Sequence, residues 1–261
     1  MPEEKVVRLA FFAGVLAVVA VWEAAAPRRS LTTGKGRRWF ANLSLVAIDT
    51  AAAYFIFPLL PVGMALFARE QGWGILNQLD LPSWLNGALA VIALDFVIYL
   101  QHVMFHHVPV FWRFHRMHHT DLDFDVSTGN RFHPLEIILS TGIKLAAVAV
   151  LGAPPQAVLV FEVLLNATSM FNHGNIRIPA GIDRRLRLCM VTPDMHRVHH
   201  SVIPRETNAN FGFNLPWWDR LCGTYRAQPD EGHEGMTIGL KEFRDPRMLT
   251  LHRLLALPFI K

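Results

Sequence analysis

Four long apolar stretches decide what this chain of 261 residues can fold into. A helix needs about 17 to 25 mostly apolar residues to cross a bilayer, and residues 6–22, 41–68 and 84–105 each qualify. The fourth stretch, residues 134–171, is too long for one crossing. GAPP at 152–155 interrupts it, because proline cannot continue a helix and glycine weakens one. We expect an all-α integral membrane protein with four to five membrane-embedded helices, including a helical hairpin over the fourth stretch, and with a cytosolic helical cap rich in histidine.

The composition supports a membrane protein. Hydrophobic residues make up 52% of the chain and charged residues only 18%, so the apolar share exceeds that of an ordinary soluble domain. The two cysteines, Cys189 and Cys222, share no ligand spacing, so we expect neither a disulfide framework nor a zinc knuckle. The net charge of +4 comes with no basic stripe among aromatics and no nucleotide-binding glycine loop. Nucleic acid is therefore not an expected partner.

The first apolar stretch has two interpretations. EAAA after it resembles a signal cleavage site, whereas MPEEKVVR is not net positive and Pro27 follows the alanines, which favours a retained anchor. Five basic residues between the first two spans place that loop in the cytoplasm: Arg28, Arg29, Lys35, Arg37 and Arg38. Three crossings and a returning hairpin then bring every histidine cluster to the cytoplasmic face, of the inner membrane if the source is bacterial.

Three short histidine motifs carry the chemistry of the chain. HVMFH spans 102–106, HRMHH spans 115–119 and HRVHH spans 196–200. On a helix, positions i, i+3 and i+4 share one face, so we expect eight imidazoles to converge from three helices: His102, His106, His115, His118, His119, His196, His199 and His200. A ninth candidate is His173 in FNHGN, with a structural histidine bonded to a carbonyl at a helix end as the alternative. One metal ion takes about four to six donors, so nine nitrogens suit two ions.

The remaining polar candidates receive weaker predictions. His107 lies about 100° from His106 around a helix and is expected to be spare, while His133 precedes a proline and suits a structural or outer-shell role. No role is assigned to His233 or His252. Three carboxylates are candidates for binding the second ring nitrogens, with a helix cap or a salt bridge as the alternative: Asp95, Asp194 and Asp219.

These motifs resemble the fatty acid hydroxylase and sterol desaturase superfamily. The similarity covers roughly residues 90–226 and includes WRFHRMHH, RFHPLE, NHGN, TPDMHRVHHS and WDRLCGTY. It implies a non-haem centre of two iron ions held by the eight box histidines, with dioxygen as co-substrate and a lipid as the target. Phe211 and Cys222 replace the tyrosine and phenylalanine that the family often has, and neither change touches a ligand.

The resemblance also suggests a domain organisation and a reaction. We expect a membrane anchor region with two spans at 1–83, a catalytic domain at 84–226, and a C-terminal tail with an interfacial segment at 227–261. The expected reaction is mono-oxygenation of a lipid C–H bond, with desaturation as an open alternative. No haem, flavin or iron–sulfur signature is present, so an external reductase or carrier protein must supply electrons.

Three further alternatives remain open at this stage. Basic residues on the cytosolic side either dock an acidic electron carrier or form a lipid-facing rim: Arg113, Arg116, Arg184, Arg185 and Arg187. A membrane zinc hydrolase uses the same nitrogens but normally has a glutamate base beside them, as in HExxH. A histidine-rich metal transport protein places its histidines within the spans or in a flexible tract.

Overall fold

A computed structural model describes residues 2–260 of the chain, which contain helices and no strand. Seven helices form the body of the molecule: α1 (Pro2–Ala25), α2 (Lys35–Ile56), α3 (Pro61–Glu70), α4 (Ser83–His107), α5 (Pro109–His119), α6 (Pro134–Leu151) and α7 (Pro155–Asn172). Four segments are long and apolar enough to cross a membrane: Glu3–Ala25, Lys35–Glu70, Ser83–His107 and Pro134–Leu151. The expectation of an all-α membrane protein is confirmed.

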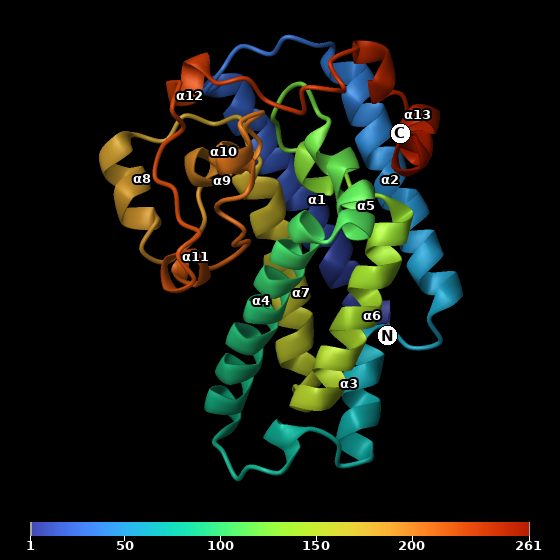
Figure 1. Ribbon diagram of the computed structural model, residues 1–261. Coiled ribbons are helices and arrows are strands. Elements are labelled where there is room, and N and C mark those ends of the chain that lie inside the picture. Colours follow the sequence, from blue (N-terminus) through green and yellow to red (C-terminus); the bar gives the residue numbers. More distant parts are fainter. Residues whose placement is uncertain (1, 261) are drawn as a thin grey trace.

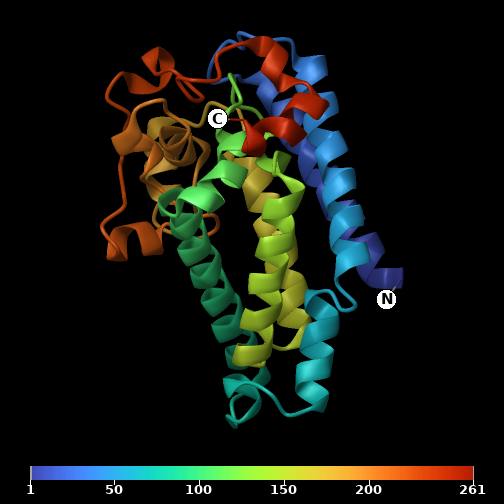
Figure 2. The same ribbon diagram turned by 45° about the vertical axis from the view of Figure 1, so that its right-hand side comes forward.

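Short helices and loops build a cap at one end of this bundle (Figures 1 and 2). The helices of the cap are α8 (Ala180–Leu186), α9 (Pro193–His199), α10 (Pro204–Thr207), α11 (Trp217–Leu221) and α12 (Gly232–Gly235). Single-turn helices lie at Ile75–Asn77, Thr128–Asn130, Pro246–Leu249 and Leu257–Phe259, and α13 covers Leu251–Ala256. In Figure 1 the loop between α1 and α2 lies at the same end as the cap, and α3 lies at the opposite end.

The apolar core of the bundle lies between α3, α4, α6 and α7. Ala65, Ala90, Val148 and Phe161 are fully buried there or nearly so. The predicted hairpin is present, because α6 ends at Leu151 and α7 starts at Pro155. Gly152 closes α6 in the left-handed conformation at φ 67°, which a side chain rarely adopts. The hairpin returns the chain to the cap end just before the ninth candidate histidine.

The second apolar stretch is not one continuous helix, contrary to the prediction. PLLP at 58–61 separates α2 from α3, since proline cannot stay within a helix. Helix α2 also starts at Lys35, so Arg37 and Arg38 belong to the helix and not to the loop before it. Arg38 is fully buried and its guanidinium donates to Asp121 at 2.6 Å and to Asp125 at 2.7 Å.

The last segment packs against the bundle. Leu254 and Leu257 are fully buried in one cluster with Leu45 of α2 and Met117 of α5. Phe259 stays 70% exposed, so only part of this amphipathic segment is covered. Its contact with a bilayer interface stays a prediction.

Candidate metal centre

Three helices and one helix end bring the nine candidate histidines together. Helix α4 carries His102 and His106 one turn apart, α5 carries its box in the last turns, and α9 with its C-cap residue His200 carries the third box. His173 is the residue that ends α7. Eight of the nine rings are at most 2% exposed, and His106 is partly exposed. The spacing argument for shared helix faces therefore agrees with the observed geometry.

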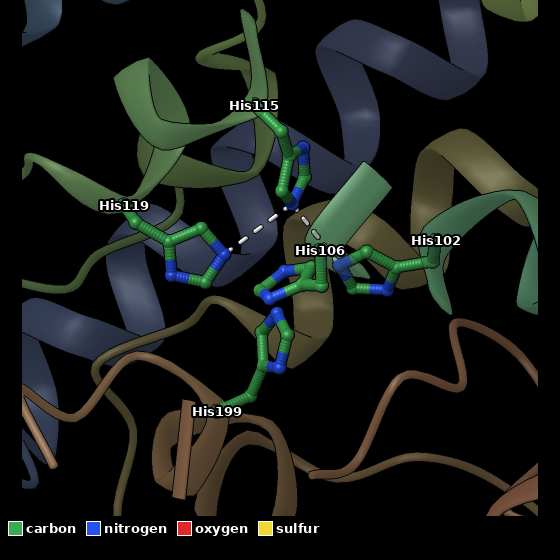
Figure 3. A group of neighbouring side chains, drawn as sticks. All are labelled: His102, His106, His115, His119 and His199. Atoms are coloured by element: carbon green, nitrogen blue, oxygen red, sulfur yellow. Dashed lines mark hydrogen bonds between the residues drawn. The ribbon is translucent and has the colours of Figure 1, made fainter. Parts of the chain in front are cut away.

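The rings form two groups, and in each group one nitrogen per ring lies within 4.8 Å of all the others. The first group has five members, shown in Figure 3: His102, His106, His115, His119 and His199. The second group has four: His118, His173, His196 and His200. Each HRxHH box divides between the groups, with its i and i+4 histidines in one group and its i+3 histidine in the other.

Hydrogen bonds at the Nδ1 atoms fix which ring nitrogen carries the proton. In the first group, His102 Nδ1 lies 2.7 Å from the carbonyl oxygen of Phe211, and His199 Nδ1 lies 2.8 Å from that of Ala209. A carbonyl oxygen only accepts, so each Nδ1 must donate and each Nε2 keeps a lone pair. His115 Nδ1 lies 2.7 Å from Glu136 Oε1 and donates to that oxygen when the carboxyl group is ionised.

The same arrangement occurs in the second group. His118 Nδ1 lies 3.2 Å from the carbonyl oxygen of Arg131, and His173 Nδ1 lies 2.7 Å from that of Ser169. Both rings therefore present lone pairs at Nε2.

In each group, the Nε2 lone pairs of two rings face each other at short range. His102 Nε2 lies 3.1 Å from His115 Nε2, and His118 Nε2 lies 3.1 Å from His173 Nε2. Two lone pairs at this distance repel unless a cation lies between them. Burial lowers the pKa of both His115 and His173 to about 3, so a proton does not supply that cation at neutral pH.

These distances fit two nitrogens on one metal ion. Two ligands each about 2.1 Å from an ion lie about 3.0 Å apart at a right angle and about 3.4 Å apart at a tetrahedral angle. The Nε2–Nε2 contacts here are 3.1 to 3.3 Å, including that of His196 with His173. His106 and His199 also leave Nε2 buried without a hydrogen-bond partner. The residues present fit a metal ion in each group.

The three predicted carboxylate partners do not touch the histidine rings of either group. Asp95 accepts from Trp218 Nε1 and from Asn214, so it joins α4 to the cap. Asp219 accepts from the backbone N–H groups of Phe211 and Gly212 at 2.8 and 2.9 Å. Asp219 thereby holds the loop whose carbonyl orients His102, which makes its role indirect.

Asp194 is also occupied elsewhere. It pairs with Arg197 and with Arg28, at 3.3 Å in the second case, and His233 Nε2 lies 3.6 Å away. The salt-bridge alternative therefore applies to Asp194.

The carboxylate that does contact a ring is Glu136, which the sequence reasoning missed. Its Oε1 accepts from His115 Nδ1 at 2.7 Å, and its Oε2 is buried without a partner. Glu136 lies in the first turn of α6, three residues after the helix cap His133. Acidic residues are common in the first turn of a helix because they favour its positive end, so the position of Glu136 alone gave no signal of a contact with the site.

The other histidines lie outside both groups. His133 caps α6 by accepting from the Leu135 N–H, and its Nε2 lies 3.2 Å from the Leu255 carbonyl oxygen, so its role is structural. His107 and His252 are exposed, whereas burial lowers the pKa of His233 to about 4.

The candidate docking arginines divide in two. Arg113, Arg184 and Arg185 are exposed. Arg187 is buried and pairs with Asp183 at 2.6 Å, and Arg116 donates to the Leu257 carbonyl at 2.9 Å, so both serve the fold.

Comparison with known proteins agrees with this arrangement. The fatty acid hydroxylase family model matches residues 87–224, more than half of the chain, and these residues include all nine histidines. The chain belongs to the fatty acid hydroxylase family. The resemblance seen in the motifs is thereby confirmed.

Curated relatives of this family member carry names of lipid enzymes. Ornithine lipid hydroxylase of Rhizobium tropici is 31% identical over 57% of this chain and 44% of its own length. Human alkylglycerol monooxygenase is 30% identical over 68% of this chain and 38% of its own length. Rat cholesterol 25-hydroxylase is 27% identical over 67% of this chain and 57% of its own length. The chain thus spans less than half the length of the first two relatives, and no solved structure matches it.

Proposed function

We propose that this protein is a membrane lipid mono-oxygenase in which each histidine group holds one iron ion. The observation that carries the proposal is the forced meeting of the His118 and His173 Nε2 lone pairs in the second group, which recurs between His102 and His115 in the first group when Glu136 is ionised. Iron supplies the redox chemistry that lets dioxygen oxidise an unactivated C–H bond, which zinc lacks. The family membership and the names of the relatives support a lipid as the substrate.

In this proposal the residues of the chain hold and orient the metal ligands. Backbone carbonyls at Ala209, Phe211, Arg131 and Ser169, together with Glu136, orient five of the rings. Burial of the rings excludes water from both groups. The second group offers four nitrogens against five in the first, so it leaves more room for a substrate.

The contacts of Glu136 argue against the zinc hydrolase alternative. A hydrolase base must reach the water on the open side of the metal. Glu136 instead binds His115 at Nδ1, the nitrogen opposite the converging Nε2 atoms. A transport protein is also disfavoured, because eight of the nine rings are buried and fixed by neighbours.

The test is metal and product analysis of the purified protein. We expect two tightly held irons per chain after expression in iron-replete cells, and transfer of label from ¹⁸O₂ into a lipid alcohol when reductant is supplied. An unlabelled alkene would indicate desaturation. Persistent zinc would favour the hydrolase, and readily exchangeable metal would favour transport.

Single histidine variants locate the chemistry. His118→Ala and His199→Ala remove one member of the second and first group, respectively, and should abolish product while membrane insertion is retained. His252→Ala changes an exposed histidine outside both groups and is the matched control. Full activity in either of the first two variants would contradict the assignment.

We further propose that the cap faces the cytoplasm and receives electrons there from an external donor. Cys189 and Cys222 are free, exposed and both on the cap, so they report its side directly. A membrane-impermeant maleimide should label them in inside-out vesicles and not in intact cells. Labelling in intact cells would reverse the proposed orientation.

A further inference from the structure

Helices α1 and α7 enclose an apolar groove that no part of the metal centre uses. The groove has a volume of about 610 Å³ and is lined mainly by Phe11, Gly14, Val18 and Trp22 of α1 with Phe171 of α7. Met190, in the loop before α9, lines it from the cap side. Almost all of its lining is apolar. We call it the α1–α7 groove.

The floor of the α1–α7 groove adjoins the second histidine group. Val19 lines the groove and is 3% exposed. A Cβ added to Gly174 would lie 3.1 Å from Val19 Cγ1, so α1 touches the residue that follows His173. Phe171 lies two residues before His173 on the other wall. The groove walls therefore flank the chain segment that carries His173, a member of the group with only four nitrogen donors.

Exposed residues of the cap indicate where the bilayer surface lies. Helices α8 and α11 project to one side of the bundle in Figure 1. Ile182, Leu188, Trp217 and Leu221 are 42% to 76% exposed there, with arginines beside them. Apolar and aromatic side chains mixed with basic ones are typical of segments at a membrane interface. Met190 lies two residues after Leu188, so the cap end of the groove lies near the membrane interface and the rest of the groove lies deeper in the bilayer.

A polar hollow follows the groove at the same end. It has a volume of about 410 Å³ and is lined by Arg28, Arg177, Asp194 and Glu234, among others. Both walls of the groove lead into this hollow, because Arg28 comes shortly after the end of α1 and Arg177 comes shortly after the end of α7. The segments that follow the two helices are joined by a β-bridge between Pro27 and Ile176. An apolar groove that ends at a charged hollow matches a molecule with a hydrocarbon chain and a polar head.

We propose that the α1–α7 groove binds one hydrocarbon chain of a membrane lipid, which is the substrate, beside the chain segment that carries His173. At this depth the bilayer offers hydrocarbon as the apolar ligand, and the charged hollow receives the polar end. The proposal rests on the proposed function for the step that follows binding. Helix α1 lies outside the residues that the family model matches, so this binding surface is a feature of this chain beyond the shared domain.

Gly14 offers a clean way to fill the groove. A Cβ at this position meets no heavy atom within 4 Å, so Gly14→Leu adds volume to the groove without a clash. Ala13→Leu is the matched control, since Ala13 is the neighbouring residue on the same exposed helix and does not line the groove. The added leucine displaces about two methylene groups of a bound chain, which lowers occupancy roughly tenfold.

The experiment uses the full chain in vesicles of phosphatidylcholine that carries a diazirine on one acyl chain. Photolysis and peptide mass spectrometry should find crosslinks concentrated on the groove residues of α1 and α7. Gly14→Leu should reduce these crosslinks roughly tenfold, and Ala13→Leu should leave them unchanged. Crosslinks spread evenly around α1, or equal in both variants, would overturn the binding site.

Turnover separates a substrate site from an ordinary lipid contact. Gly14→Leu should lower product formation or shift it toward shorter chains while iron content stays at the wild-type level. Lost crosslinks with unchanged turnover and chain selectivity would overturn the substrate assignment. A wild-type protein without iron or product would refute the proposed function instead, while the crosslinks would still report on the groove.

Discussion

Glu136 provides the sharpest test of how the metal ligands are oriented. Its Oε1 accepts from His115 Nδ1 at 2.7 Å in a fully buried setting. It is the one carboxylate that touches a ring of either group among residues 2–260. A hydrogen bond to a charged group contributes about 1.5 to 3 kcal/mol, against about 1 kcal/mol for a neutral one. The bond to Glu136 therefore favours the tautomer that leaves His115 Nε2 free.

Two substitutions separate the charge of Glu136 from its hydrogen bond. Glu136→Gln can still accept at the same place and loses about 1 kcal/mol, so metal affinity should fall roughly fivefold. Glu136→Ala leaves a buried Nδ1–H without an acceptor, which costs about 1 to 3 kcal/mol. For Glu136→Ala we expect a 10- to 100-fold loss of affinity, the range known for partners of metal-ligating histidines.

The assay is a chelator titration of the purified iron-loaded protein, with iron per chain measured after each step. Glu162→Gln is the control, because Glu162 is a partly buried carboxylate on α7 that binds Arg8 at 2.6 Å and Lys144 at 3.1 Å and touches no histidine. Metal affinity should be unchanged in this control. Wild-type affinity in both Glu136 variants would refute the view that this carboxylate fixes the ligand.

Two more predictions concern residues around the site. Asp219→Ala should release the loop at Phe211 and leave two backbone N–H groups unpaired. The free energy of unfolding should fall by about 2 to 4 kcal/mol. An unchanged unfolding temperature in detergent would contradict this prediction. Burial lowers the pKa of His233 to about 4 in the folded protein, whereas it is about 6.5 in the unfolded chain. As the pH falls from about 6.5 to about 4, His233 therefore binds a proton in the unfolded chain before it does so in the folded protein. Stability should then fall by up to about 1.4 kcal/mol per pH unit, and His233→Gln should reduce that slope.

The sequence was sufficient for features that depend on local spacing. Apolar length predicts the spans, GAPP at 152–155 predicts the hairpin turn, and the box spacing predicts shared helix faces. The prediction of one continuous helix over the second span is wrong, because the apolar run includes PLLP at 58–61, whose two prolines separate α2 from α3. Arg38 was assigned to a loop by the charge rule, whereas its true partners lie more than 80 residues away.

The groups that orient the rings could not be predicted from sequence. Four of the groups that accept a hydrogen bond from a ring Nδ1 are backbone carbonyls. Every residue has a backbone carbonyl, so the identities of Ala209 and Ser169 give no sign of this role in the sequence. The three aspartates were candidates because carboxylates often partner metal-bound histidines. In the fold they orient loops and bind arginines, and Glu136 reaches the ring from a helix start instead.

The interleaving of the two groups explains why the chain carries HRxHH twice. On a helix the i and i+4 rings lie nearly in line, while the i+3 ring is offset to one side. On α5 the aligned rings belong to the first group and His118 to the second, and on α9 the aligned rings belong to the second and His199 to the first. Each short helix therefore contributes to both groups. Neither group can form until α5, at the end of the bundle, and α9, in the cap, are packed together, so the two histidine groups themselves join the cap to the membrane helices.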